Sequence, residues 1–134
     1  MKKTNKNHVP ILNIERIQDY LDKFIKLRGW EKYRTPKNLC MALSVETSEL
    51  LKIFQWEKNV SAKIIIKNKK IMEEATEEIA DILSYLAQLA RILNIDLDCA
   101  FWNKIKKTEE KYSIEKTKKQ SKNMQQRNKY CSKS

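Results

Sequence analysis

Residues 71–93 of the chain read IMEEATEEIADILSYLAQLARIL, and this stretch decides the fold. Its apolar residues recur every three or four positions, which is the spacing of one face of an α-helix. No Gly or Pro interrupts the run, and Asn94 follows where the helix can end. The stretch therefore predicts an amphipathic helix with an apolar stripe formed by Ile79, Ile82, Leu83, Leu86, Leu89, Ala90 and Leu93.

Two more helices are predicted before this one. Residues 14–28 carry apolar side chains at helical spacing, with Asn13 as a suitable N-cap and Gly29 at the stop. The next helix begins at Thr35-Pro36, because threonine is a good cap and proline suits the first helical position. Its apolar face continues to about Trp56.

A fourth helix is predicted after the long one, capped by Asp96 and reaching about Lys111. Residues 57–70 leave two interpretations open. Their lysines and Asn59 indicate a loop, whereas the β-branched Ile64–Ile66 segment favours a short packed turn or an extension of the next helix.

The whole chain agrees with an all-α fold, which we predict to be a four-helix bundle. It has 134 residues with one Gly and two Pro, too few turn residues for a β-rich domain of this length. No run of about 18 apolar residues is present, so we expect no membrane contact. The three cysteines form no CxxC pair, which is typical of a reduced, cytoplasmic protein.

The formal charge of +11 lies mostly at the two ends. We predict a flexible N-terminal arm over residues 1–12, a helical domain over residues 13–112 and a basic, disordered tail over residues 113–134. A cationic tail attracts nucleic acid without specificity. Because the tail lacks interleaved aromatic side chains, we do not expect nucleic acid to be a partner.

Two acidic pairs carry the chemistry of the sequence. Glu46 and Glu49 lie three residues apart in the second predicted helix, as do Glu78 and Asp81 in the third. Residues three apart are neighbours on a helix surface. Glu46 falls inside the apolar stripe of its helix, and a buried carboxylate needs a cation or a strong hydrogen bond. If the two helices pack antiparallel, all four carboxylates converge.

Four carboxylates without His or Cys nearby favour a hard divalent cation. Mg²⁺ fits this chemistry, with Mn²⁺ as a possible substitute, whereas Zn²⁺ usually recruits nitrogen or sulfur. The alternative is an ordinary solvated face, since acidic spacing is common on Glu-rich helices. Glu73, Glu74 and Glu77 illustrate this on the same helix.

The surroundings of the pairs resemble a known family. The segments Gly29–Tyr33 and Thr35–Leu39 lead into ALxxExxELxxxFQW over residues 42–56, and EEIADILxYL follows over residues 77–86. This combination is similar to the MazG-like all-α NTP pyrophosphatases, in particular their dCTP pyrophosphatase-like branch. The resemblance covers roughly residues 14–112.

The resemblance implies Mg²⁺-dependent hydrolysis of a (d)NTP to the (d)NMP and pyrophosphate, as house-cleaning of the nucleotide pool. The metal ligands would be Glu46, Glu49, Glu78 and Asp81. Glu46 or Glu49 would also orient the attacking water, and the residues do not separate these roles.

The resemblance also implies a set of substrate-binding residues. Trp30 and Trp56 match aromatic positions that stack on the base, although core packing explains them equally well. Tyr85 follows Asp81 by one helical turn. The later family positions that face the phosphates correspond to Lys104, Lys111 and Tyr112.

Three positions depart from the family pattern. Leu21 stands where the first helix of similar enzymes supplies a histidine to the base pocket, Thr108 where Asn is common and Ser113 where Pro is common. These changes leave the preferred base open. They also leave open that the protein is a non-catalytic nucleotide-binding module. A nucleic-acid binder acting through the tail is a further alternative.

Self-association is the last expectation from the sequence. Four helices with wide apolar faces exceed what one small bundle can cover, and similar proteins are dimers or tetramers. We therefore expect a homodimer or homotetramer.

Overall fold

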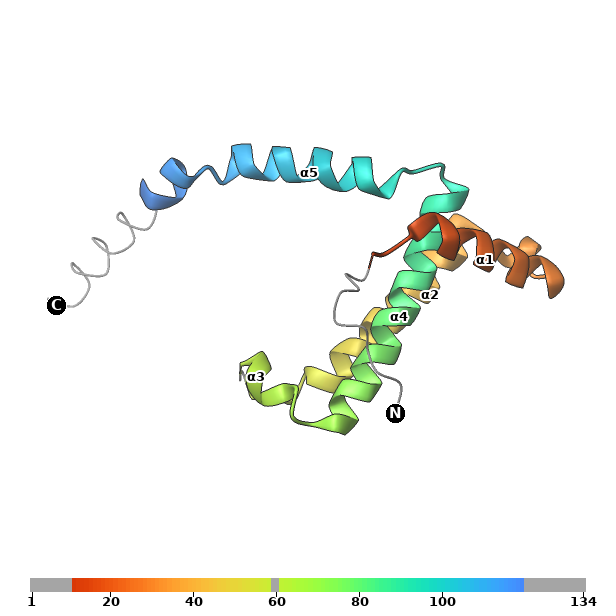
Figure 1. The fold of residues 1–134 in the computed structure, drawn as a ribbon, viewed down its shortest axis with the longest axis horizontal. Coiled ribbons are helices and arrows are strands. Elements are labelled where there is room, and N and C mark those ends of the chain that lie inside the picture. The colour runs from red at the N-terminus through yellow and green to blue at the C-terminus, as the bar shows by residue number, and fades with distance from the viewer. Residues whose placement is uncertain (1–10, 59–60, 120–134) are drawn as a thin grey trace, which may run out of the picture. The chain divides into compact units, whose positions relative to one another are not determined.

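The computed structural model describes residues 11–58 and 61–119 of the chain. All regular structure in these two ranges is helical, which confirms the predicted all-α class. None of the helices in these ranges is long and apolar enough to cross a membrane. The elements, in chain order, are α1 (Ile14–Leu27), the short 3₁₀ helix η1 (Glu31–Tyr33), α2 (Pro36–Phe54), α3 (Ala62–Ile65), α4 (Lys69–Ile92) and α5 (Leu97–Lys111) (Figure 1).

The chain divides into two compact units. The first runs to Ile95 and contains α1 to α4, and the second begins at Asp96 and contains α5. The predicted arm over residues 1–12 lies mainly outside the described residues, as does most of the predicted tail.

Helix α1 begins and ends as its sequence predicts. The Asn13 side chain accepts a hydrogen bond from the backbone N–H of Arg16, which caps the helix. At the other end, Gly29 has a φ of 65°. This left-handed conformation suits glycine, because it has no Cβ to clash with the backbone. It lets the N–H groups of Gly29 and Trp30 bond to the carbonyls of Lys26 and Ile25.

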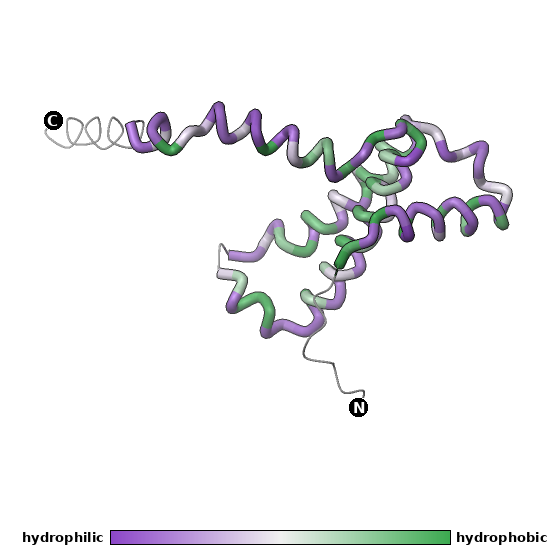
Figure 2. Tube along the Cα trace, turned by 45° about the horizontal axis from the view of Figure 1, so that its top comes forward, coloured by the Kyte–Doolittle hydropathy of each residue, from purple (hydrophilic) through white to green (hydrophobic). Residues whose placement is uncertain are grey.

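Helices α2 and α4 form the centre of the first unit. They pack along each other and run in opposite directions (Figure 1), which is the condition under which the two acidic pairs can converge. Thr35 caps α2 and Asn68 caps α4 through their side-chain oxygens. Each helix mixes hydrophobic and hydrophilic residues along its length (Figure 2). The buried apolar residues among those described are Ile25, Leu39, Ala75, Ala87 and Ala90.

Helix α1 is held against α4 by polar contacts. The amide of the buried Gln18 donates to the carbonyl oxygen of Ala87 at 2.9 Å. Asp22 of α1 pairs with Arg34, just before α2, and with Arg91 near the end of α4, where Nε to Oδ2 is 3.1 Å. Asp22 therefore joins α1 to the start of α2 and to the end of α4.

The segment between α2 and α4 contains a short helix, α3, and α4 starts separately at Lys69. The isoleucines therefore do not extend the next helix, and they form a short separate helical turn. Ile64 and Ile66 are exposed, so the turn is not packed as a core element.

The second unit consists of α5 and the residues that follow it. Asp96 caps α5 by accepting from the N–H of Cys99 at 3.0 Å, as predicted. The rings of Phe101 and Trp102 meet edge to face with centroids 5.1 Å apart. Residues 114–119 are helical, so the first part of the predicted disordered tail has regular structure.

The Asp22 contacts generate a stability prediction. The Arg34 side chain is only 14% exposed, so Asp22→Asn leaves a largely buried guanidinium without its counter-charge. We expect a loss of about 1–3 kcal/mol in the free energy of unfolding, measured by urea denaturation.

Asp19→Asn is the matched control, because Asp19 is 54% exposed and contacts only Arg91 among the ion pairs of the described segments. A loss below about 1 kcal/mol is expected there. Equal losses for both variants would contradict this role of Asp22.

Candidate metal centre

Glu46 lies in the middle of the buried face of α2. Taking about 100° per residue, Leu39, Leu43, Leu50 and Ile53 lie within about 60° of it around the helix axis. All four are at least partly buried. Because this face packs on α4, the packing that covers these apolar residues also draws the Glu46 carboxylate between the two helices.

Three carboxylates meet there. Glu46, Glu78 and Asp81 each bring one oxygen to a group in which these atoms lie within 4.8 Å of one another. Glu46 and Glu78 are half-buried, and Asp81 is exposed. Glu78 Oε2 is buried and has no hydrogen-bond partner within the segments that the structure describes. A buried oxygen without a partner is costly, so a cation bound to this atom would stabilise the site.

The electrostatics of the group point the same way. The pKa of Glu78 is raised above its usual value of 4.5, mainly because burial disfavours the charged form. The negative charge of Glu46 and a side-chain hydrogen bond between the two carboxyl groups raise this pKa further, followed by the charges of Glu49 and Asp81. A divalent cation bound between these carboxylates would attract each of them and so offset their mutual repulsion.

The residues fit such a cation. Oxygens bound to one Mg²⁺ at about 2.1 Å lie no more than about 4.2 Å apart. The observed spread of up to 4.8 Å closes with small side-chain rotations. The donor set holds carboxylate oxygens alone, which suits Mg²⁺ or Mn²⁺.

Glu49 lies outside the group of three. Its carboxylate pairs with Lys52, one turn later on α2, with Nζ to Oε2 at 3.2 Å. Its charge still raises the pKa of Glu78, so the two side chains are near each other. Both groups of this ion pair are substantially exposed, and such pairs contribute little stability. Glu49 can therefore leave Lys52 and turn towards a cation at small cost.

The predicted aromatic residues lie in different surroundings. Trp30 is half-exposed and packs edge-on against Phe24 of α1, with ring centroids 6.2 Å apart. Trp56, just after α2, is 88% exposed and is free to stack on a ligand. Tyr85 is partly buried on α4, one turn after Asp81.

The predicted phosphate-facing residues belong to the second unit. Lys104 and Lys111 are exposed on α5. The Nζ of Lys111 lies 5.2 Å from the ring centroid of Tyr112, which is a cation–π contact. Their roles remain predictions.

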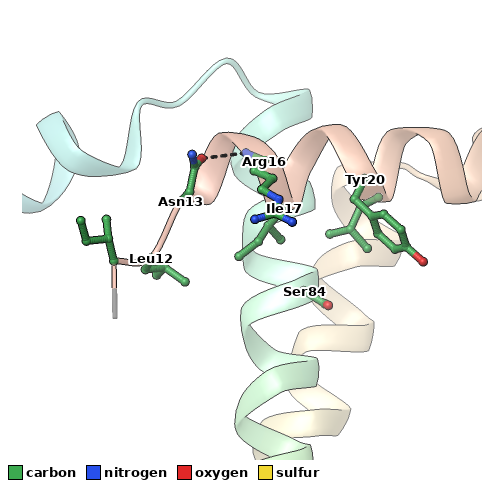
Figure 3. Close-up of a pocket in the computed structure, with 8 residues that line it drawn as sticks. Leu12, Asn13, Arg16, Ile17, Tyr20 and Ser84 are labelled. Atoms are coloured by element: carbon green, nitrogen blue, oxygen red, sulfur yellow. Dashed lines mark hydrogen bonds between the residues drawn. The ribbon is translucent and has the colours of Figure 1, made fainter. Parts of the chain in front are cut away.

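Sequence reasoning missed a pocket between the start of α1 and the middle of α4. Its volume is about 500 Å³, within the range of small-ligand sites. Figure 3 shows Ile17 and Tyr20 on α1 beside Ser84 on α4. Ser84 follows Asp81 by one helical turn, so one lining residue of the pocket lies near the acidic group. The lining residues are Ile11, Leu12, Asn13, Arg16, Ile17, Tyr20, Leu21 and Ser84.

One signal in the sequence pointed to this pocket. Leu21 lines it, and Leu21 is the position where the resemblance implies a base-binding histidine. The remaining lining residues come from α1, the residues before it and one position of α4. Their proximity arises from how α1 crosses α4, which spacing along the chain does not reveal.

A comparison with family models defines the class of the protein. The model of the MazG-like family matches residues 41–126, a range that includes both acidic pairs. The chain therefore belongs to the MazG-like family.

Individual relatives agree with this assignment. The chain is 30% identical over 105 residues to dCTP pyrophosphatase 1 of Rattus norvegicus, covering 78% of this chain and 62% of the relative. It is 31% identical over 96 residues to dCTP pyrophosphatase 1 of Homo sapiens, covering 72% of this chain and 56% of the relative. It thus spans only about 60% of the length of these curated relatives.

A solved structure is also similar along most of the chain. The crystal structure of a pyrophosphatase from Archaeoglobus fulgidus DSM 4304 superposes with a TM-score of 0.68 at 40% sequence identity. The match covers 81% of this chain and 99% of that one.

The raised pKa of Glu78 generates a prediction for the metal-free protein. Above pH 4.5 the unfolded chain releases this proton before the folded chain does, so the folded state loses stability as the pH rises through the raised pKa. Glu78→Gln removes the charge. We expect its melting temperature in EDTA to exceed that of the wild type by a margin that grows as the pH rises from 4.5 through the raised pKa of Glu78.

Glu77→Gln is the matched control, because Glu77 is exposed and lies outside the acidic group. Added Mg²⁺ should raise the melting temperature of the wild type and of the control, but not that of Glu78→Gln. A margin that is constant with pH would contradict the assignment of the buried charge to Glu78.

Proposed function

We propose that the protein is a Mg²⁺-dependent nucleoside triphosphate pyrophosphohydrolase that converts a (d)NTP to the (d)NMP and pyrophosphate. The observation that carries the proposal is the group of Glu46, Glu78 and Asp81, with its unpartnered Glu78 oxygen, inside the region matched by the MazG-like family. The names of the relatives, dCTP pyrophosphatase 1 and a pyrophosphatase, support the same reaction.

The acidic group explains why the reaction would need a metal. A triphosphate carries about four negative charges, and carboxylates repel it in the absence of a cation. Bound Mg²⁺ supplies charge neutralisation of the phosphate oxygens and polarises the attacking water. Glu46, Glu78 and Asp81 would hold the cation, and Glu49 would join them after leaving Lys52.

The bond changes follow from the products. The oxygen of a water molecule forms a bond to the α-phosphorus, and the bond between this phosphorus and the oxygen that bridges to the β-phosphorus breaks. Pyrophosphate leaves with that bridging oxygen. A carboxylate of Glu46 or Glu49 orients the water and accepts its proton.

The nucleoside would bind in the pocket between α1 and α4. One lining residue, Ser84, lies one helical turn from Asp81 of the acidic group, which supports a nucleotide whose phosphates lie towards that group. Tyr20, Ile17 and Leu21 offer an apolar surface to a base, and Asn13 and Arg16 offer polar groups. This supports an aromatic ligand that also carries polar groups.

The other predicted substrate contacts stay part of the proposal. Trp56 is exposed enough to close over a base, and Trp30 and Tyr85 are further candidates. Lys104, Lys111 and Tyr112 would contact the phosphates. We also propose that the enzyme is a cytoplasmic homodimer or homotetramer that cleans the nucleotide pool, which agrees with the many exposed apolar side chains.

The metal ligands generate the central activity prediction. A panel of NTPs and dNTPs with Mg²⁺ should release pyrophosphate from at least one nucleotide. Glu46→Gln and Asp81→Asn should each lower kcat/KM by on the order of 10²-fold or more, because each removes a charge that holds the cation. Glu77→Gln should stay within about twofold of the wild type. Mg²⁺ binding by calorimetry without any pyrophosphate release would refute the enzymatic proposal and favour a nucleotide-binding module.

The pocket generates a separate prediction. Leu21→Trp fills space in the pocket without touching the acidic group. We expect KM for the best nucleotide to rise about tenfold or more, with Mg²⁺ affinity unchanged. Ile64→Trp, at an exposed site away from the pocket, is the control. If Leu21→Trp leaves KM unchanged, the nucleoside binds elsewhere, and Trp56 becomes the first candidate.

A further inference from the structure

Lys52 of α2 lies at the edge of the acidic group, where the helix surface meets solvent. Its Nζ contacts both carboxylate oxygens of Glu49, at 3.4 and 3.2 Å. Taking about 100° per residue, Glu49 lies about 60° from Glu46 around the helix axis, and Lys52 lies about 60° further in the same direction. The Lys52 side chain is 64% exposed, so its flexible stem lets the ammonium group move away from Glu49.

Lys52 and the pocket lie on opposite sides of the acidic group along the two helices. Ser84, which lines the pocket, follows Asp81 by about 4.5 Å towards the end of α4. Lys52 follows Glu46 by about 9 Å towards the end of α2. Because α2 and α4 run in opposite directions, these two displacements also point in opposite directions (Figure 1). The acidic group therefore lies between Ser84 and Lys52.

This order along the helices matches the order of groups in a nucleotide. In a nucleoside triphosphate the α-phosphate lies between the nucleoside and the β- and γ-phosphates. A nucleotide with its nucleoside in the pocket and its α-phosphate at the acidic group would therefore direct its β- and γ-phosphates towards Lys52.

The charge balance of the site also favours a contact between Lys52 and phosphate. Glu46, Glu49, Glu78 and Asp81 carry up to four negative charges, and a triphosphate adds about four. A bound Mg²⁺ supplies about two positive charges against them. When Glu49 turns to the cation, the Lys52 ammonium leaves its carboxylate at the place where negative charge is in excess. An ammonium group binds phosphate as a point charge.

We propose that Lys52 changes partners. It holds Glu49 in the metal-free protein, and it binds the β- and γ-phosphates, which leave as pyrophosphate, after a cation has drawn Glu49 away. The inference rests on the proposed function for the identity of its ligand. It also means that Lys52 opposes binding of the metal alone, since its charge competes with the cation for Glu49.

Two affinities measured by calorimetry test this exchange without catalysis. Lys52→Met removes the ammonium group and keeps a long, unbranched side chain. We expect the Kd for Mg²⁺ to fall by about threefold or more, because Glu49 no longer has a competing cation. With Mg²⁺ at saturation, the Kd for inorganic pyrophosphate should rise by about tenfold or more, because a charge-assisted contact is lost. A variant that folds poorly would lose both affinities, so opposite shifts report on Lys52 itself.

Lys70→Met is the matched control, because Lys70 forms the same kind of exposed helical ion pair, with Glu74 at 3.8 Å, outside the acidic group. Both of its affinities should equal those of the wild type. Lys52→Arg keeps a cation at this position, and it should bind pyrophosphate within about threefold of the wild type.

An unchanged Kd for either ligand in Lys52→Met, or shifts of both in the same direction, overturns the proposal. A wild type that binds no pyrophosphate with Mg²⁺ overturns it too. If no nucleotide releases pyrophosphate while the opposite shifts are observed, the enzymatic proposal fails and the contact of Lys52 with pyrophosphate stands. If Lys52→Met hydrolyses nucleotides and binds pyrophosphate like the wild type, the exchange fails and the enzymatic proposal stands.

Discussion

The packing of α2 along α4 is the constraint on which the rest of the structure depends, because it brings like charges together. Glu46 lies on the same face as Leu39, Leu43 and Leu50, so the helix cannot bury these leucines without also bringing a carboxylate to α4. There it meets Glu78 and Asp81. Burial and the charge of Glu46 together raise the pKa of Glu78 above its usual value. A protein with no use for the carboxylates would be more stable with apolar residues at these positions.

The position of α1 depends on a different kind of contact. The amide of Gln18 and the carboxylate of Asp22 join α1 to α4 through specific polar contacts. Polar contacts of this kind define a geometry more narrowly than apolar ones, because hydrogen bonds require defined distances and angles. The pocket beside Ser84 exists only in this geometry, since α1 and the residues before it supply all of its lining except Ser84. The metal ligands and the pocket are thus held in place by separate sets of contacts.

The buried core of the first unit is small for its helices. Three of the five buried apolar residues in the described part of the chain are alanines, which bury little surface. Ile79, Leu86 and Leu93 of α4 are instead exposed. The same helix therefore has two surfaces of opposite character. One side brings charges together for a cation, and the other exposes large apolar side chains.

Much of the fold could be predicted from local sequence, because helix ends depend on neighbouring residues. The caps at Asn13, Thr35 and Asp96 and the stop at Gly29 are where the sequence places them, since each satisfies backbone groups a few residues away. The short helix α3 was harder, because its isoleucines fit a loop, a turn or a longer helix.

The candidate site could also be predicted only in part from the sequence. The spacing of Glu46, Glu49, Glu78 and Asp81 and their place beside apolar residues are properties of single helices, so the sequence by itself identified these four carboxylates as candidate ligands of a cation. Only the tertiary structure decided that Glu49 pairs with Lys52, that one oxygen of Glu78 has no partner, and that α1 forms a pocket one turn from Asp81. These features depend on how helices far apart in the chain cross and on which charges desolvate one another. The periodicity of a single helix reveals neither the crossing of the helices nor the burial of the charges.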